Sequence, residues 1–72
     1  MNEIEKTLLS FYRSETENGK TFVCYTIDEV AETLGFTRKE IQNSRNALKR
    51  MGFIRVEYVK DYCWRTYYIN QE

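Results

Sequence analysis

This chain of 72 residues contains two cysteines and no histidine, and its formal net charge is zero. Without histidine, neither a histidine-based catalytic triad nor a Cys/His zinc site can form, and two cysteines alone do not complete a tetrahedral zinc site. A chain of this length makes one domain, which we take to span residues 1–72.

No stretch of the sequence has the length and hydrophobicity of a membrane-spanning helix, and no basic segment followed by an apolar one marks a signal peptide. We therefore expect a cytoplasmic protein with no membrane partner. Cys24 and Cys63 could pair in principle, but two free thiols are the better interpretation for a protein without a secretion signal.

The first helix is predicted over residues 3–14, with Asn2 as its N-cap. Its apolar side chains recur at helical spacing and define one stripe, namely Ile4, Leu8, Phe11 and, at its margin, Tyr12. Leu9 lies off that stripe. The polar residues 14–21 contain an Asn-Gly pair, which is a turn signal and predicts an exposed loop. Residues 22–25 are apolar and rich in β-formers, which predicts a short first strand.

Two capping boxes, Thr26 with Glu29 and Thr37 with Glu40, predict the starts of a second and a third helix. Gly35 can adopt the left-handed conformation that ends the second helix, so the two helices are joined by a tight turn. The expected inner face of the second helix comprises Ile27, Val30, Ala31 and Leu34. The expected inner face of the third comprises Ile41, Ser44, Leu48 and Met51.

A hairpin is predicted from residues 53–59 and 62–69, turning at residues 60–61. A two-residue loop, or a four-residue loop of the same register, would pair Ile54 with Tyr67. Alternation then gives a core face of Ile54, Val56, Tyr67 and Ile69. The opposite face would carry Arg55, Glu57, Trp64 and Thr66.

The two central helices and their turn resemble the helix-turn-helix family. Ala31 is the small residue at the helix crossing, Gly35 the turn glycine, Phe36 the apolar residue after it, and Ile41 the anchor of the second helix of the motif. The following run, LKRMGFIRVEYVKDYCWRTYYIN, resembles the wing of a winged helix-turn-helix. The resemblance covers nearly the whole chain. It implies an α+β fold of three helices with a small three-stranded antiparallel sheet, in the order helix, strand, helix, helix, strand, strand.

The zero net charge hides an uneven distribution. Residues 1–36 contain three Lys or Arg and seven Asp or Glu, whereas residues 37–72 contain eight and four. The positive half consists of the third helix and the wing. A local basic face matters more for the attraction of phosphates than the sum over the chain does.

Stepping about 100° per residue from Ile41 gives the third helix a polar far face and flank without an acidic side chain. These residues are Arg38, Lys39, Gln42, Asn43, Asn46, Lys49 and Arg50, with Arg45 on the flank of Arg38 and Lys49. The resemblance implies that this face enters the major groove of DNA, where Asn and Gln bond adenine and Arg and Lys bond guanine or phosphate. In the wing, Arg55, Lys60 and Arg65 are candidates for contacts with phosphates or the minor groove. The alternatives are a merely solvated helix face or a protein partner, and Glu57 and Asp61 dilute the charge of the wing.

The expected function is sequence-specific binding of double-stranded DNA. The run ALKRMGFIRVEY, with TYYIN behind it, also resembles the N-terminal DNA-binding domains of phage and plasmid replication proteins. By analogy, a standalone copy this short suggests a small transcriptional regulator of mobile-element type. The alternative is a protein-interaction module that uses the aromatic sheet face.

We expect no enzymatic activity, because the sequence contains no Gly-rich phosphate loop and no nucleophile–base set, and we expect no cofactor, metal or small-molecule ligand. The short chain and its many aromatic residues predict a homodimer. Its interface would be the first helix, at Leu9 and Tyr12, or the aromatic wing face, at Tyr62 and Trp64.

Overall fold

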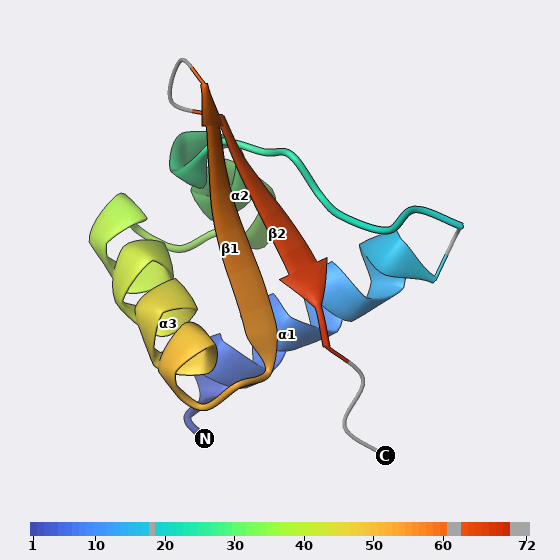
Figure 1. Ribbon diagram of the computed structural model, residues 1–72. Coiled ribbons are helices and arrows are strands. Elements are labelled where there is room, and N and C mark those ends of the chain that lie inside the picture. Colours follow the sequence, from blue (N-terminus) through green and yellow to red (C-terminus); the bar gives the residue numbers. More distant parts are fainter. Residues whose placement is uncertain (18, 61–62, 70–72) are drawn as a thin grey trace.

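The computed structural model describes residues 1–17, 19–60 and 63–69. It is a small α+β domain in which three helices precede a two-stranded antiparallel sheet (Figure 1). The helices are α1 (Glu3–Thr16), α2 (Ile27–Leu34) and α3 (Arg38–Arg50), and the strands are β1 (Ile54–Lys60) and β2 (Cys63–Tyr68). The α+β class and the three helices predicted from the sequence are therefore confirmed.

All three helices begin with a capping box, as their first residues dictate. The Glu29 N–H donates to Oγ1 of Thr26 over 3.1 Å, and the Thr26 N–H donates back to the Glu29 carboxylate over 3.1 Å. The same reciprocal pair is present at the starts of α1 and α3. Each box satisfies two backbone donors that a helix start leaves without partners. The starts of α2 and α3 lie where the sequence predicted them, and α1 continues to Thr16, two residues beyond its predicted end.

The turn between α2 and α3 depends on Gly35. Its φ of 77° is in the left-handed region, which glycine enters without the steric cost of a Cβ atom. The N–H groups of Gly35 and Phe36 both donate to the carbonyl of Ala31, at 2.9 and 3.0 Å. These bonds end α2, and only the three residues 35–37 separate it from α3.

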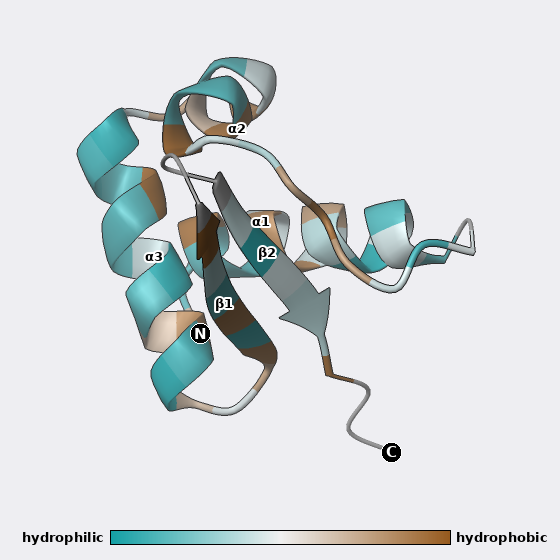
Figure 2. Ribbon diagram, turned by 45° about the horizontal axis from the view of Figure 1, so that its top comes forward, coloured by the Kyte–Doolittle hydropathy of each residue, from teal (hydrophilic) through white to brown (hydrophobic). Residues whose placement is uncertain are grey.

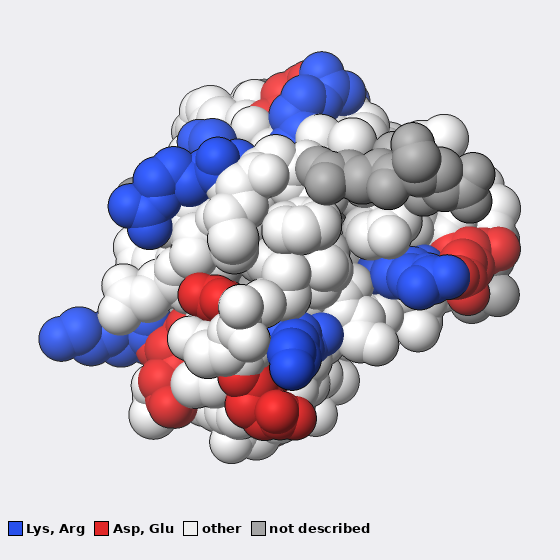
Figure 3. Space-filling view, turned by 90° about the horizontal axis from the view of Figure 1, so that it is seen from below, with Lys and Arg blue, Asp and Glu red and all other residues white. Residues whose placement is uncertain are grey.

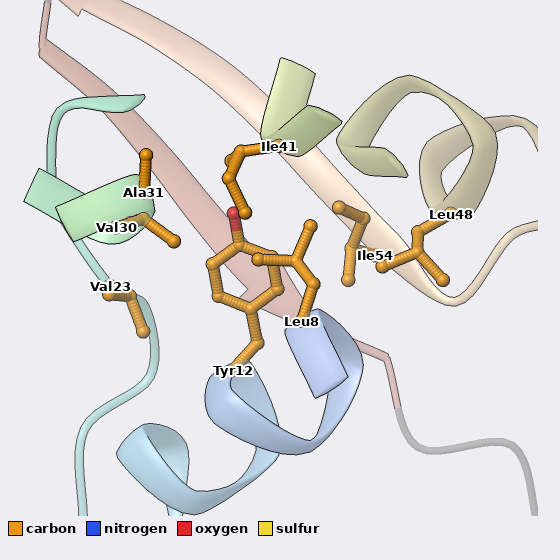
Figure 4. Close-up of a cluster of buried hydrophobic side chains, with 8 residues drawn as sticks. All are labelled: Leu8, Tyr12, Val23, Val30, Ala31, Ile41, Leu48 and Ile54. Carbon is orange, nitrogen blue, oxygen red and sulfur yellow. The ribbon is translucent and has the colours of Figure 1, made fainter. Parts of the chain in front are cut away.

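The core is formed where the three helices meet the inner face of the hairpin, and Figure 4 shows the Tyr12 ring in the middle of it. Its buried apolar residues are Leu8, Tyr12, Val23, Val30, Ala31, Ile41, Leu48 and Ile54. The predicted inner face of α3 is confirmed for Ile41, Ser44 and Leu48. It is wrong for Met51, which is 45% exposed because it caps the end of the helix beyond the core. In α1 the prediction placed Phe11 inside and Tyr12 at the margin, whereas Tyr12 is buried and Phe11 is only half-buried.

The predicted register of the hairpin is wrong by one residue. Ile54 lies opposite Tyr68 rather than Tyr67, because the pairing becomes irregular between Tyr58 and Lys60. A shift of one residue moves every side chain of the partner strand to the other face. Thr66, expected on the outer face, is therefore buried opposite Val56. Two residues of the predicted core face are not in the core: Tyr67 lies on the outer face and Ile69 is exposed.

The expected first strand, residues 22–25, is reduced to a single antiparallel bridge between Val23 and Thr66. Each backbone N–H of the pair donates to the carbonyl of the other over 2.9 Å. Within the described residues the sheet therefore has two strands, not the three that we expected.

Cys24 is disulfide-bonded in the structure, so the expectation of a free thiol there is wrong. It follows the bridge residue Val23 and so runs beside β2, the strand that contains the other cysteine of the chain. Local sequence patterns do not predict this proximity, because the bridge joins Val23 to the distant Thr66.

Candidate nucleic-acid interface

The polar face of α3 is exposed because the opposite side of the helix is fixed in the core. Ile41 and Leu48 are fully buried and Ser44 nearly so, which leaves α3 no freedom to rotate about its axis. Figure 2 shows the α3 ribbon as mostly hydrophilic, with the few apolar positions interrupting it. Seven of the ten residues that the sequence singled out are on this helix and all are exposed: Arg38, Lys39, Gln42, Asn43, Asn46, Lys49 and Arg50.

Four of these residues line one shallow hollow on the surface: Asn43, Asn46, Lys49 and Arg50. The hollow combines two amide groups, which both donate and accept hydrogen bonds, with two cations. Such a set can recognise a ligand that offers polar edges beside negative charge.

The electrostatics of this face favour an anionic partner. Glu40, the single acidic residue of α3, is held in the capping box, where its carboxylate accepts the Thr37 N–H over 2.9 Å. Among the described residues, the structure gives no ion pair to Lys39, Lys49 or Arg50. Those three cations therefore keep their full attraction for an external anion.

Arg38, at the start of α3, differs from the other cations of the helix. Its guanidinium lies 3.6 Å from the Asp28 carboxylate of α2, and both side chains are about 70% exposed. An ion pair this exposed contributes little to stability, so Arg38 can exchange Asp28 for another anion at small cost.

The cations of the hairpin do not join the α3 face. Arg55 and Arg65 point away from the helices, and the Glu57 carboxylate between them lies 4.0 and 3.9 Å from their guanidinium groups. Their guanidinium carbons also lie over aromatic rings, that of Arg55 4.3 Å from the Tyr67 ring centre and that of Arg65 4.8 Å from the Phe22 ring centre. The third predicted residue of the hairpin, Lys60, has a side chain outside the described part of the structure.

Three residues outside the predicted site adjoin it. The Arg45 guanidinium of α3 lies 5.6 Å from the centre of the Trp64 ring, and the Tyr58 ring meets Trp64 edge-on at 4.9 Å. Arg45 was recognised on the flank of the helix but not included among the binding residues. Tyr58 lies opposite Trp64 only in the observed register, so the register predicted from the sequence did not bring these two rings together.

Tyr12 lies beneath this surface and has a structural role. Burial raises the pKa of its hydroxyl above the ordinary value of 10.0, while the nearby Arg45 charge and a hydrogen bond with the Thr66 side chain oppose that rise. The bond ties α1 to β2. Because Tyr12 is only 3% exposed, it cannot line a dimer interface on α1, and that part of the prediction is wrong.

Charge is unevenly distributed over the surface that Figure 3 shows from below. Most acidic side chains lie in the lower half and at the right edge of that view, whereas a basic cluster at its upper left has only uncharged side chains around it. This agrees with the separation of charge along the sequence.

The described part of the chain contains no group of three His, Cys, Asp or Glu side chains placed to hold a metal ion. Nor does any of its helices have the length and apolar character needed to cross a membrane. Comparison with models of known families, with curated proteins and with solved structures gives no match.

Proposed function

We propose that this protein is a winged helix-turn-helix that binds double-stranded DNA with sequence specificity, as a small cytoplasmic transcriptional regulator of phage, plasmid or other mobile-element type. The supporting arrangement is α2, a short glycine turn, α3 and a hairpin, in that order. In this interpretation the bridge at Val23 takes the place of the small first strand of the fold.

The observation that carries the proposal is the exposed α3 face without an acidic side chain. From Lys39 to Arg50 this face spans about 16 Å along the helix axis, at about 1.5 Å per residue. The major groove of DNA is about 12 Å wide and accepts an α-helix end or side. Asn43, Asn46, Lys49 and Arg50 line one hollow on this face. In the proposed complex Asn43 and Asn46 bond adenine edges, and Lys49 and Arg50 bond guanine or phosphate.

The test is selection from a random duplex pool, followed by titration of variants on the enriched duplex and on a scrambled one. Asn43→Ala and Asn46→Ala should each weaken binding to the enriched duplex by about 1–3 kcal/mol and flatten the sequence preference. Lys49→Ala should weaken both duplexes alike and reduce the dependence of affinity on salt by about one phosphate contact. Its matched control is Lys6→Ala, an exposed lysine of α1, which should change neither.

If the three α3 variants bind as the parent does while their thermal melts remain cooperative, α3 is not the recognition helix. Selection that enriches no sequence, together with equal affinity for all duplexes, would limit the activity to non-specific binding.

A homodimer is part of the proposal, because two copies related by a two-fold axis would read two half-sites about one helical turn apart. The first candidate interface is the outer side of α1 around the half-buried Leu9. That end of the chain is rich in acidic residues, so pairing there would leave both basic α3 faces free. The second candidate interface is the wing face, of which Tyr62 lies outside the residues that the structure describes.

A protein-interaction module is the second candidate, and the exposure of Tyr58 and Val59 on the hairpin is the observation that favours it. Exposed aromatic and aliphatic side chains are typical of contact surfaces between proteins. The two candidates differ in the role of α3. Variants of Asn43, Asn46 and Lys49 would leave a partner of the hairpin unaffected, whereas they weaken DNA binding.

A further inference from the structure

The hairpin exposes a small aromatic surface beyond the core. Tyr58 is 58% exposed and Val59 is 41% exposed, although both belong to β1. Tyr58 lies four residues, about 13 Å, along the strand from the buried Ile54. At this distance its ring adds little to the hydrophobic core. Covering such a ring with a partner would remove apolar area from water, which is favourable.

The aromatic surface, formed by Tyr58 and Trp64, lies on the face of the hairpin that is turned toward the helices. Tyr58 pairs with Trp64, and this pair shares its face with Val56 and the buried Thr66. The opposite face carries Glu57 and its two ion-pair partners, Arg55 and Arg65. Figure 1 shows α3 lying beside β1. The contact of Arg45 with the Trp64 ring places the aromatic pair next to α3.

Arg45 connects the two surfaces. It stands on α3 and its guanidinium lies over the Trp64 ring at 5.6 Å. Its flank of the helix also carries Arg38 and Lys49. The two acids that are ion-paired near this region, Asp28 and Glu57, are each bound to arginine. The aromatic surface is thus continuous with a positive one, and a polyanion with apolar parts fits it better than a neutral or basic protein does. Duplex DNA is such a polyanion and is the partner proposed for the neighbouring α3 face.

We propose that Tyr58 and Trp64 contact the sugars and base edges of duplex DNA next to the segment bound by α3, and that Arg55 and Arg65 do not contact it. This inference rests on the proposed function and adds a second contact to it. The hairpin contact is apolar. Removal of Tyr58 therefore weakens binding without changing the number of neutralised phosphates, and the salt dependence of the affinity stays the same.

The experiment is a fluorescence-anisotropy titration of the full chain with a labelled mixed-sequence duplex and with its separated top strand, at about 50 and 200 mM salt. Tyr58→Ala should weaken duplex binding about fivefold or more, which corresponds to about 1 kcal/mol, at both salt concentrations. Tyr58→Phe keeps the ring and should bind as the parent does. Tyr25→Ala removes another exposed tyrosine, which lies against Phe11 and Glu15 of α1, and serves as the matched control. Arg55→Ala should leave both affinity and salt dependence unchanged.

The outcomes separate this inference from the function on which it rests. If the parent binds duplex and Tyr58→Ala binds equally well, the hairpin contact is refuted and the α3 site stands. A reduced salt dependence in Arg55→Ala would show that Arg55 neutralises a phosphate, and would refute the claim that the outer face of the hairpin does not contact DNA. If the parent binds the single strand more tightly than the duplex and Tyr58→Ala loses that preference, the duplex contact is refuted. The aromatic pair would then be a surface on which unpaired bases stack. If the parent binds neither probe, the proposed function fails and the inference fails with it.

Discussion

Leu48→Ala tests the placement of α3, on which the candidate site depends. Leu48 is fully buried in the cluster that joins α3 to α1 and β1, and its carbonyl accepts the Phe53 N–H that begins the hairpin over 3.0 Å. The substitution removes three carbon atoms from the core. At about 0.8 kcal/mol per buried methylene the transfer cost alone is about 2.4 kcal/mol, and the remaining cavity raises the total to about 2–5 kcal/mol.

That cost is large for a domain of this size. A chain of 72 residues has an expected free energy of unfolding of about 4–11 kcal/mol, from about 0.05–0.15 kcal/mol per residue. Each kcal/mol lost lowers the melting temperature of a domain this small by about 4–8 °C, so a loss of about 3 kcal/mol lowers it by about 12–24 °C.

The measurement is thermal unfolding followed by far-ultraviolet circular dichroism. Lys49→Ala is the matched control, because it changes the next, exposed residue of the same helix and should shift the midpoint by only a few degrees. If Leu48→Ala is too unstable to show a transition, Ile41→Val at a second fully buried position should still cost about 0.5–1.5 kcal/mol. Leu48→Ala melting within a few degrees of the parent would mean that the inner face of α3 is wrongly assigned.

Two further predictions concern α1. Burial raises the pKa of Tyr12 in the folded protein above 10.0, the ordinary value that applies to the unfolded chain. As the pH rises past 10.0, the unfolded chain therefore loses this proton first. The contribution of Tyr12 to the free energy of unfolding is complete below that pH and declines above it. In denaturant melts, Tyr12→Phe should remove the part of the alkaline loss of stability that comes from this hydroxyl. At neutral pH the substitution should cost about 1–3 kcal/mol, because the buried Thr66 hydroxyl loses its partner. An unchanged alkaline profile would contradict the raised pKa of Tyr12. Light scattering over a concentration series should give the mass of two chains, with Leu9→Glu returning the mass of one, and a monomer at high protein concentration in both low and moderate salt would refute the dimer.

The helices could be predicted because their signals are local. A capping box needs only a Thr and a Glu three residues apart, and both Thr26 and Thr37 mark their helices correctly. The inner face of α3 follows from a spacing that the backbone imposes over a few turns. The α3 part of the candidate site was therefore predictable, since a residue opposite Ile41 or Leu48 must face solvent.

The hairpin could not be predicted to the same degree, because its register depends on one irregular step between Tyr58 and Lys60. Nothing in the alternation of side chains distinguishes a two-residue turn from a turn with that extra residue. Either register turns Ile54 and Val56 of β1 toward the core, so the apolar pattern of that strand does not choose between the two registers. The error placed Trp64 on the outer face and concealed its contact with Arg45.

The ion pairs also had to come from the structure, and they show which of the nominated cations already have a partner. Of the cations that the sequence nominated, Arg38, Arg55 and Arg65 are engaged by Asp28 or Glu57. Lys39, Lys49 and Arg50 remain on the α3 face without such partners in the described residues.

If Lys39, Lys49 and Arg50 alone each neutralise one phosphate, the slope of log affinity against log salt is about −2.7, so one chain would lose about 40-fold in affinity between about 50 and 200 mM salt. A dimer with two such faces doubles the slope and loses about 10³-fold over the same range. The salt dependence of the parent protein therefore reports how many chains bind at once. A slope near −2.7 for a protein that light scattering finds to be a dimer would mean that only one α3 face contacts DNA, and that the two-fold arrangement serves some purpose other than reading paired half-sites.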